Sequence, residues 1–448
     1  MANYKLNYRI GGCLVLISLF LQSCGRLSGQ CVPESGKFVE DVSTANQEEQ
    51  RGVINHNLSL TFTKFQAHQG NAGFQYILGT MYYRGQEVVQ NYQKALQWYE
   101  KSAIQGHPGA QNNLGWMYQN GIGITQDYQK ALEWFTRSAM QGHVLAQHTL
   151  GWIYQNGVGI TQNDEEALQW YQAAANQGYR EAQFSLGIIY DNGYGVNQDR
   201  DQMLRWYGAA ANQGHVIAQA KLGEIYQFGE GVNQDYREAL RWYGAAAAQG
   251  STIAKHALGW MYQHALGVAQ DYRKALTWYE QAASQGDVGS QTNLGWMYQH
   301  GLGVAQDYQK AFRCYKVAAK HGDANAQNNL GMMYQCGIGV AQKYQKALKW
   351  FQIAVRQGHA ASKNNIGIVY FRGQGVPQDF REALRWYEEA ANQGNVDAQY
   401  NLGLMYVCGG IGLDKDGPKA LEWFWKAAEQ GCLAAQVHVE EITKGRPS

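Results

Sequence analysis

The 448-residue sequence is poor in charge and in proline. Charged residues make up only 16 % of it, the formal net charge is +1, and Lys and Arg are not concentrated in any block. Proteins that bind nucleic acid need a basic patch against the phosphates, so the composition speaks against a nucleic-acid partner. Five prolines against 53 glycines favour many helices that end at glycine and few rigid turns.

Motifs of enzymatic chemistry are also missing. The sequence contains no S-x-x-K, K-T-G, G-x-S-x-G, H-E-x-x-H or C-x-x-C pattern and no P-loop. It therefore offers no nucleophile with a paired base, no zinc motif and no phosphate-binding loop. We expect no catalytic residue, no metal and no cofactor.

The apolar run near the N-terminus is short. It extends from Ile10 to Leu21, about twelve residues, whereas a helix that spans a membrane needs about twenty. The cations Lys5 and Arg9 precede it, which is typical of a secretory signal peptide. The sequence Leu21-Gln-Ser-Cys24 resembles a bacterial lipobox, which implies cleavage before Cys24, lipidation of Cys24 and a membrane anchor that does not span.

The residue after this cysteine refines the expected location. Gly25 carries no acidic retention signal, so the resemblance to lipoproteins implies the outer membrane of a Gram-negative host. Plain secretion and an uncleaved anchor are alternatives. An adaptor of the endoplasmic reticulum, with a glycosylation sequon at Asn57-Leu-Ser59, is a third.

What the sequence does have is a repeat. The stretch from His107 to Gly142 recurs end to end, and its Leu114-Gly115 step, once as Ile366-Gly367, returns every 36 residues. Ten copies cover residues 71–431. A fixed period between about 20 and 50 residues indicates a solenoid of stacked units.

Each copy is predicted to form a helical hairpin. Ala110, Leu114 and Met117 fall on one stripe of a first helix, which ends at Gly121 because glycine accepts the left-handed conformation that closes a helix. Asp127 is placed as the N-cap of a second helix. Because neither helix can bury its apolar face alone, each hairpin must stack on the next.

Two positions of the hairpin are predicted to be structural. The glycine of each Leu-Gly step is small where two helices approach closely. One tryptophan recurs on the second helix of nine copies, and we expect it in the core: Trp98, Trp134, Trp170, Trp206, Trp242, Trp278, Trp350, Trp386 and Trp423.

The repeat resembles that of a known family. The pattern A-x-x-x-L-G-x-x-Y-x-x-G-x-G-V-x-x-D-x-x-K-A-L-x-W-Y-x-x-A-A-x-Q-G is nearly intact in residues 254–286, apart from Ala265 at the first loop glycine, and it is similar to the Sel-one-like repeats, relatives of the tetratricopeptide repeats. The resemblance implies an all-α, right-handed solenoid of helix-turn-helix repeats that binds proteins or peptides, frequently as an adaptor. Departures include Glu87, Met203, Cys314 and Lys343, the last in place of the Asp cap.

The domain organisation can be read from these signals. We expect a signal peptide over residues 1–24, a flexible tether over 25–52 and an N-terminal capping helix within 53–70. The ten repeats occupy 71–431, and a C-terminal capping helix and tail occupy 432–448.

Four histidines at one repeat position could suggest a metal site, but the expected distance between neighbouring repeats speaks against it. His107, His143, His215 and His359 share one repeat position, where other copies have Ser, Asp or Asn, so we expect them to cap first helices. Equivalent positions in stacked hairpins lie about 10 Å apart, whereas zinc ligands lie about 2 Å from one ion.

Seven cysteines leave the redox state open. Cys336 and Cys408 hold equivalent positions two repeats apart and should be too distant to bridge. Cys314 and Cys336 lie on adjacent helices and are offset by more than a turn, so a disulfide there is the less favoured alternative. Cys432 is the fourth cysteine of the solenoid.

One stripe on the first helix varies from copy to copy while the framework stays nearly fixed. It lies about 200° from the Leu position, off the core face. We expect it to line the concave wall, with Trp for hot-spot contacts and Gln and Asn amides for peptide backbone. The alternative is that these Trp only pad neighbouring repeats. The predicted groove residues are Trp116, Trp152, Phe184, Ile188, Trp260, Trp296, Met332, Ile368 and Tyr400.

The sequence thus favours a non-enzymatic scaffold of the cell envelope that binds a protein or peptide along its concave face. Two alternatives remain. One is a cell-wall or β-lactam hydrolase, because some cysteine-rich members of the family have been described as β-lactamases. The other is a glycan binder that uses the same exposed Trp.

Overall fold

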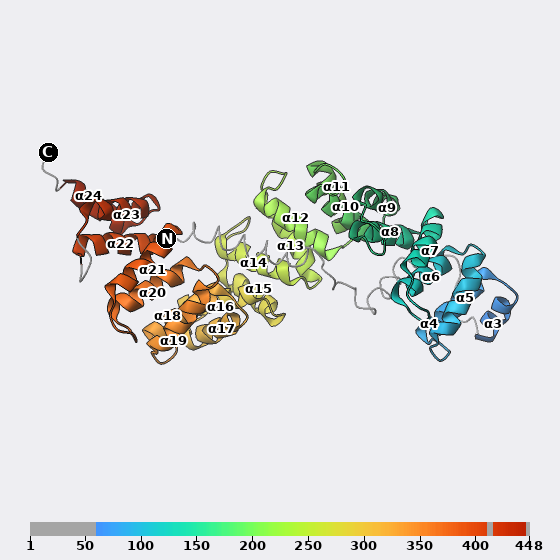
Figure 1. The fold of residues 1–448 in the computed structure, drawn as a ribbon, viewed down its shortest axis with the longest axis horizontal. Helices are drawn as coiled ribbons and strands as arrows, with labels where there is room; N and C mark the ends of the chain where they lie inside the picture. Colours follow the sequence, from blue (N-terminus) through green and yellow to red (C-terminus); the bar gives the residue numbers. More distant parts are fainter. Residues whose placement is uncertain (1–59, 410–414, 445–448) are drawn as a thin grey trace. The chain divides into compact units, whose positions relative to one another are not determined.

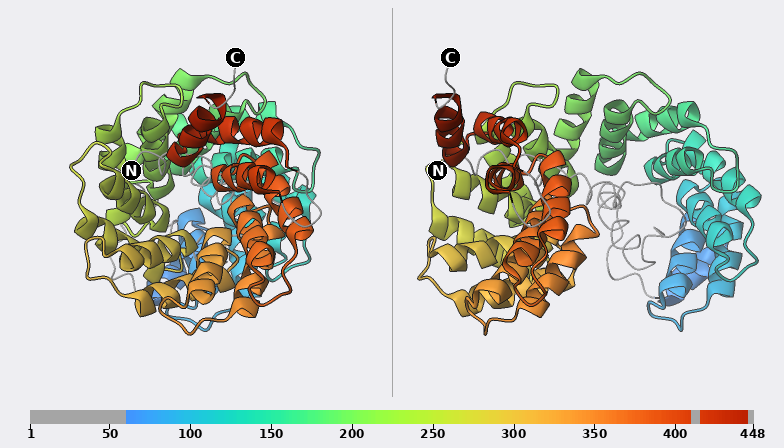
Figure 2. Two further views of the ribbon diagram at one scale, coloured as in Figure 1. Left: turned by 90° about the vertical axis from the view of Figure 1, so that its left-hand side faces the viewer. Right: turned by 60° about the vertical axis from the view of Figure 1, so that its left-hand side comes forward.

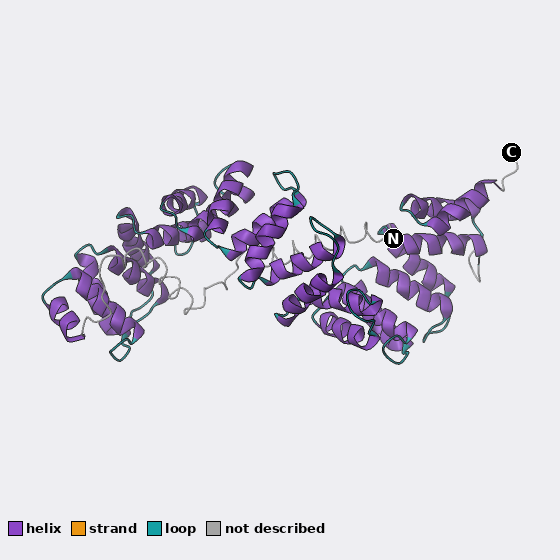
Figure 3. Cartoon of the chain, turned by 180° about the vertical axis from the view of Figure 1, so that it is seen from behind, coloured by secondary structure: helices purple, strands orange, loops and turns teal. Residues whose placement is uncertain are grey.

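The computed structural model describes residues 60–409 and 415–444. These residues form twenty-two α-helices and no strand, as Figure 3 shows by the helix and loop colours. The predicted all-α solenoid of helical hairpins is confirmed. The predicted signal peptide with Cys24, the tether and the sequon at Asn57 lie outside the described residues.

The chain divides into two compact units, whose boundary falls between Ala254 and Lys255. We call described residues 60–254 the N-terminal unit and residues 255–444 the C-terminal unit, and describe each by itself (Figure 1). The helices of the N-terminal unit are α3 (Leu60–His68), α4 (Ala72–Arg84), α5 (Tyr92–Ile104), α6 (Pro108–Asn120), α7 (Tyr128–Met140), α8 (Val144–Asn156), α9 (Asp164–Asn176), α10 (Arg180–Asn192), α11 (Arg200–Asn212), α12 (Val216–Phe228) and α13 (Tyr236–Ala248).

The C-terminal unit continues the same alternation. Its helices are α14 (Thr252–His264), which begins just before the boundary, α15 (Tyr272–Ser284), α16 (Val288–His300), α17 (Tyr308–Lys320), α18 (Ala324–Cys336), α19 (Tyr344–Val355), α20 (Ala360–Arg372), α21 (Phe380–Asn392), α22 (Val396–Cys408), α23 (Gly417–Glu429) and α24 (Leu433–Lys444). Within each unit every hairpin pairs a first helix with the following second helix and packs on the next hairpin (Figure 2).

Helix ends agree with the predicted signals. The Asp127 carboxylate accepts the Lys130 backbone N–H at 3.0 Å, and Gly121 closes α6 with φ 66°. Lys343, which replaces the Asp cap, makes no side-chain capping bond. Ala265 adopts the same left-handed conformation as the glycine it replaces, with φ 58°.

The Leu-Gly step is where the two helices of a hairpin meet. A Tyr or Phe ring from the second helix packs directly against each of the ten glycines. A Cβ added to any of them would lie less than 3.0 Å from a ring atom. These rings are among the largest fully buried side chains, for example Tyr99, Phe135 and Tyr171. The predicted close approach at glycine is confirmed, and its partner is an aromatic ring.

A ladder of glutamines joins consecutive hairpins. Gln111 of α6 donates through Nε2 to the Ala103 carbonyl of the preceding hairpin at 3.1 Å. Its Oε1 accepts from Nε2 of Gln141, at the end of its own second helix, at 2.7 Å. The same pair of bonds forms at Gln75, Gln147, Gln183, Gln219, Gln327 and Gln399. Each buried glutamine amide therefore has hydrogen-bond partners for both its N–H and its carbonyl group.

The prediction that the recurring second-helix tryptophan lies in the core is wrong for most copies. Only Trp206 and Trp242 are buried, each 7 % exposed, and the other seven are partly buried. The residue directly after the tryptophan takes the core position against glycine, which turns the indole onto the flank of the helix. There a cation often covers it, as Lys101 covers Trp98 at 4.4 Å.

The ring-on-glycine contact can be tested in one hairpin. Gly223→Ala places a methyl group about 2.6 Å from the Tyr243 ring, so we expect overpacking to lower the free energy of unfolding by about 1–3 kcal/mol. Gly244→Ala is the matched control, because nothing lies within 4 Å of a Cβ there and alanine favours the helix by about 1 kcal/mol. Urea unfolding followed by circular dichroism should give midpoint shifts of opposite sign. A loss of stability in both variants would contradict the proposed contact.

Candidate functional site on the first helices

The variable surface consists of three positions on every first helix, which in α6 are Asn112, Trp116 and Gln119. We call these positions in all ten first helices the first-helix stripe. In the C-terminal unit the consecutive first helices α20 and α22 contact each other, while no consecutive pair of second helices in the described residues does so to the same extent. Because stacked elements approach most closely on the inside of a curve, these two first helices lie on the inner side of the C-terminal unit's curve.

The predicted groove residues all lie on this stripe and are neither sealed nor fully open. Trp116, Trp152, Trp260 and Trp296 are partly buried, and Met332 is 36 % exposed. In the N-terminal unit Trp152, Phe184 and Ile188 pack against one buried cluster. Trp152 also packs, together with Trp116, against the preceding buried cluster. In the C-terminal unit the same holds for Trp260 with Trp296 and for Ile368 with Tyr400. Part of each side chain packs against neighbouring residues, and part remains exposed.

The stripe also carries contacts from one repeat to the next. The Trp116 indole N–H donates to the Tyr83 hydroxyl at 3.3 Å, which links α6 to α4. Phe184 stacks on His215, the N-cap of the next first helix, with ring centroids 4.3 Å apart. The first and second positions of the stripe are thus held in place by residues of adjacent repeats.

The glutamines at the third position are less free than predicted. Oε1 of Gln155 accepts from the Tyr171 hydroxyl at 3.0 Å, and Gln227 accepts from Tyr243 at 2.8 Å. Gln263 and Gln299 do the same with Tyr279 and Tyr315. The carbonyl end of each amide therefore satisfies a buried phenol, so these glutamines can offer a peptide chiefly their N–H groups.

Gln119 differs from these glutamines. Its second-helix partner is Phe135, which has no hydroxyl, and the buried Oε1 of Gln119 has no hydrogen-bond partner in the described residues. A buried acceptor without a partner costs about 1–3 kcal/mol.

A reciprocal pair of substitutions tests this bond. Phe135→Tyr supplies the missing hydroxyl to Gln119 and should raise the free energy of unfolding by about 0.5–1.5 kcal/mol. Tyr243→Phe strands Oε1 of the buried Gln227 and should lower it by about 1–3 kcal/mol. Denaturant midpoints measure both. A lower stability of the Phe135→Tyr protein would contradict this account, because it would mean that the new hydroxyl does not reach Oε1 of Gln119.

Sequence reasoning missed a charged interruption of the stripe in the N-terminal unit. Glu224 stands where other repeats carry Trp, and its carboxylate lies 3.0 Å from Lys221 Nζ. Asp191 and Glu230 lie within 3.9 Å of the same ammonium. Burial opposes the charge of Lys221, but the three carboxylates outweigh burial and raise its pKa. The sequence does contain a signal for this cluster, because Glu224 is an acidic residue at a position where most repeats carry an aromatic or aliphatic one.

The repeated histidines are N-caps, as predicted. Nδ1 of His107 accepts the Ala110 backbone N–H at 3.2 Å, and His143, His215 and His359 act in the same way. Within the described residues no group of three or more His, Cys, Asp or Glu side chains is placed to hold a metal ion.

Capping through a ring nitrogen makes stability depend on pH. Burial lowers the pKa of His143 and of His359 to about 4, below the value of about 6.5 in an unfolded chain. The stabilising contribution is complete above about pH 6.5 and declines as the pH falls toward 4, because only the unfolded chain binds the proton in that window. Replacing both residues by Asn, which caps α22 at Asn395, should reduce the loss of stability between pH 7.5 and 4.5. Equal losses in denaturant midpoint for both proteins would contradict this origin.

The cysteines of the solenoid are unpaired. Cys314, Cys336, Cys408 and Cys432 are free thiols, and burial raises the pKa of Cys314 to about 11. No described helix has both the length and the apolar character required to cross a bilayer.

Stacked helical hairpins with a nearly fixed framework and one variable stripe on the first helices define an α-solenoid repeat protein. The model of the Sel1 repeat matches ten consecutive segments, residues 72–107, 108–143, 144–179, 180–215, 216–251, 252–287, 288–323, 324–359, 360–395 and 396–432. The chain belongs to the Sel1 repeat family. The matched segments begin one residue later than the predicted repeats.

Two solved structures are similar to this chain over most of its length. A protective antigen present in uropathogenic Escherichia coli strains, with an SLR fold, is 35 % identical, with a TM-score of 0.82, and the alignment covers 87 % of this chain and 83 % of the antigen. A Sel1 repeat protein from Oxalobacter formigenes is 32 % identical with a TM-score of 0.56, covering 69 % of this chain and 90 % of that protein. A comparison with curated proteins finds no match.

Proposed function

We propose that the protein is a scaffold that binds a protein or peptide along the first-helix stripe. Repeats of the Sel1 and tetratricopeptide type generally mediate protein–protein interaction. The observation that carries the proposal is the partial exposure of Trp116, Trp152, Trp260 and Trp296 on the first helices, where they pack against buried residues. Rigid, half-buried Trp is the side chain most often found at binding hot spots.

The geometry favours an extended peptide as the ligand. Stripe positions recur once in every repeat, so a chain that runs across the repeats meets an aromatic or aliphatic side chain at most steps and an Asn or Gln amide at seven of the ten. The charged cluster around Lys221 interrupts this apolar row within the N-terminal unit, at α12. A partner that occupies that cluster must present polar groups at this step.

Peptides selected from a random display library on the intact protein test the stripe. Trp260→Leu with Trp296→Met removes two indoles and inserts residues that the protein itself uses at this repeat position, Leu404 and Met332. Helicity should persist. Affinity for those selected peptides that bind the stripe of the C-terminal unit should fall at least about tenfold, because loss of one hot-spot residue costs about 2 kcal/mol of binding free energy.

Trp425→Leu is the matched control for that experiment. Trp425 is 49 % exposed and lies on the second helix α23, away from the stripe. Its replacement should leave peptide affinity unchanged when measured by fluorescence anisotropy. Peptides that bind the double variant as tightly as the unchanged protein, or that lose affinity with Trp425→Leu instead, would contradict the assignment.

We further propose that the scaffold acts in the bacterial cell envelope, anchored through a lipid on Cys24 of the lipobox-like sequence. The similarity to a protective antigen present in uropathogenic Escherichia coli strains supports the bacterial part of this proposal. Mass spectrometry of the mature N-terminus after expression in a Gram-negative host should show an acylated Cys24, and Cys24→Ala should release the protein from the membrane fraction. A mature chain that begins elsewhere without acyl groups would contradict the anchor.

A further inference from the structure

A polar pocket lies among three helices of the N-terminal unit, away from the first-helix stripe. Its cavity of about 470 Å³ falls in the size range of small-molecule sites. Two lining residues come from α9, one from α10, and the rest from α11 and its N-cap: Gln172, Asn176, Tyr190, Asp199, Gln202, Arg205 and Trp206. None of these residues belongs to the stripe.

The strongest sign of a ligand is the Trp206 indole. This side chain is 7 % exposed, and its Nε1 is buried without a hydrogen-bond partner in the described residues. Arg205 stacks over the ring, with its guanidinium carbon 4.9 Å from the centroid. Buried N–H donors are nearly always paired in folded proteins, so an orphan donor at the wall of a cavity points to an acceptor that occupies the cavity.

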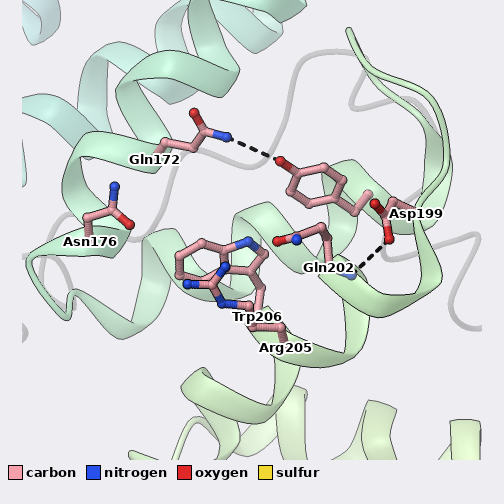
Figure 4. A pocket seen from close by; sticks show the side chains of 7 residues that line it. Gln172, Asn176, Asp199, Gln202, Arg205 and Trp206 are labelled. Carbon is pink, nitrogen blue, oxygen red and sulfur yellow. Dashed lines mark hydrogen bonds between the residues drawn. The ribbon is translucent and has the colours of Figure 1, made fainter.

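The other lining groups indicate the character of that acceptor. Figure 4 shows Gln172 and Asn176 on one side of the pocket, facing Gln202 and Trp206 on the other. The Gln172 amide donates to the Tyr190 hydroxyl at 3.2 Å, and the Asp199 carboxylate is occupied by capping α11. Three primary amides, each a donor and an acceptor, surround a site in which one cation and one anion balance.

Comparison among the repeats shows why the pocket is open here. Six other repeats carry Lys at the position of Gln202, and each ammonium lies 5.2–5.5 Å from the centroid of the tyrosine equivalent to Tyr190: Lys94, Lys130, Lys274, Lys310, Lys346 and Lys419. Trp386 also has an orphan indole N–H, but there Glu382 fills the Gln202 position and pairs with Arg385. The other two repeats also carry Glu at this position, Glu166 and Glu238, so Gln202 is the one neutral residue among the ten.

We propose that this pocket binds one residue of a neutral saccharide. A sugar offers hydroxyl oxygens to the Trp206 N–H and vicinal hydroxyls that both donate to and accept from the amides of Asn176 and Gln202. The single positive charge of Arg205 and the single negative charge of Asp199 give no preference for a charged ligand, and the polar walls disfavour an apolar one. No lining residue of the pocket belongs to the first-helix stripe, so the protein presents a peptide surface on the stripe and a separate saccharide site formed by α9, α10 and α11.

The full chain labelled with ¹⁵N-tryptophan tests the pocket. The Trp206 indole signal is assigned by its loss in Trp206→Phe, and glucose, galactose, mannose and N-acetylglucosamine are titrated in turn, with inorganic phosphate and acetate as anion probes. At least one neutral sugar should shift the Trp206 signal saturably, with a millimolar dissociation constant. If only the anions shift the signal, the pocket is an anion site and the proposal is overturned. If no probe shifts it, the indole N–H is hydrated by water and the proposal is likewise overturned.

Variants tie the sugar to this pocket. Trp206→Phe removes the orphan donor and keeps an aromatic ring, and Gln202→Lys inserts the residue that six other repeats carry, so both proteins should fold. Calorimetry should show sugar affinity at least tenfold weaker in both. Trp242→Phe, at the same position of the next repeat, is the control and should bind as the unchanged protein does. Undiminished binding by Gln202→Lys and Trp206→Phe would place the sugar elsewhere and overturn the proposal.

Discussion

The rest of the structure depends on the contact between the glycine of each first helix and the aromatic ring of the following second helix. Because an added Cβ would lie under 3.0 Å from the ring, only glycine lets the two helices approach so closely. The contact fixes the geometry of one hairpin, and the glutamine ladder passes that geometry to the next, as Gln111 does between Ala103 and Gln141. The same local rules, repeated in every hairpin, are therefore sufficient to build each unit, in agreement with the view of solenoids as nearest-neighbour assemblies.

This arrangement separates framework from surface. Positions that face the glycine, the ladder or the caps change little between copies, whereas the first-helix stripe ranges from Trp116 and Trp152 to Glu224. Two classes of ligand-facing surface result from the same scaffold. The first-helix stripe offers aromatic side chains in most repeats, and a pocket lies beside Gln202, which stands where six other repeats carry lysine. Function in such a protein is carried by departures from the repeat, not by the repeat itself.

The sequence was sufficient for the period, the hairpins, the caps and the role of the Leu-Gly glycine, because each of these is encoded locally. It could not decide which of two adjacent aromatic residues, such as Trp134 or Phe135, enters the core, since a broad apolar face accommodates either. The bond between Gln155 and Tyr171 was also hidden, because the partners lie on different helices and the amide looks free when read along one helix. The same holds for the pocket at Trp206, whose only sequence signal is the change from Lys to Gln at position 202.

The most direct test of the proposed groove locates a bound peptide on the intact protein. A peptide selected by binding is given a nitroxide label, and the paramagnetic broadening of each tryptophan indole signal is measured in ¹⁵N-tryptophan-labelled protein. We predict that the label broadens the indoles of Trp116 and Trp152, or of Trp260 and Trp296, far more than those on the second helices. Broadening centred on second-helix indoles such as Trp134 and Trp278, with the stripe unaffected, would contradict a binding groove on the first helices.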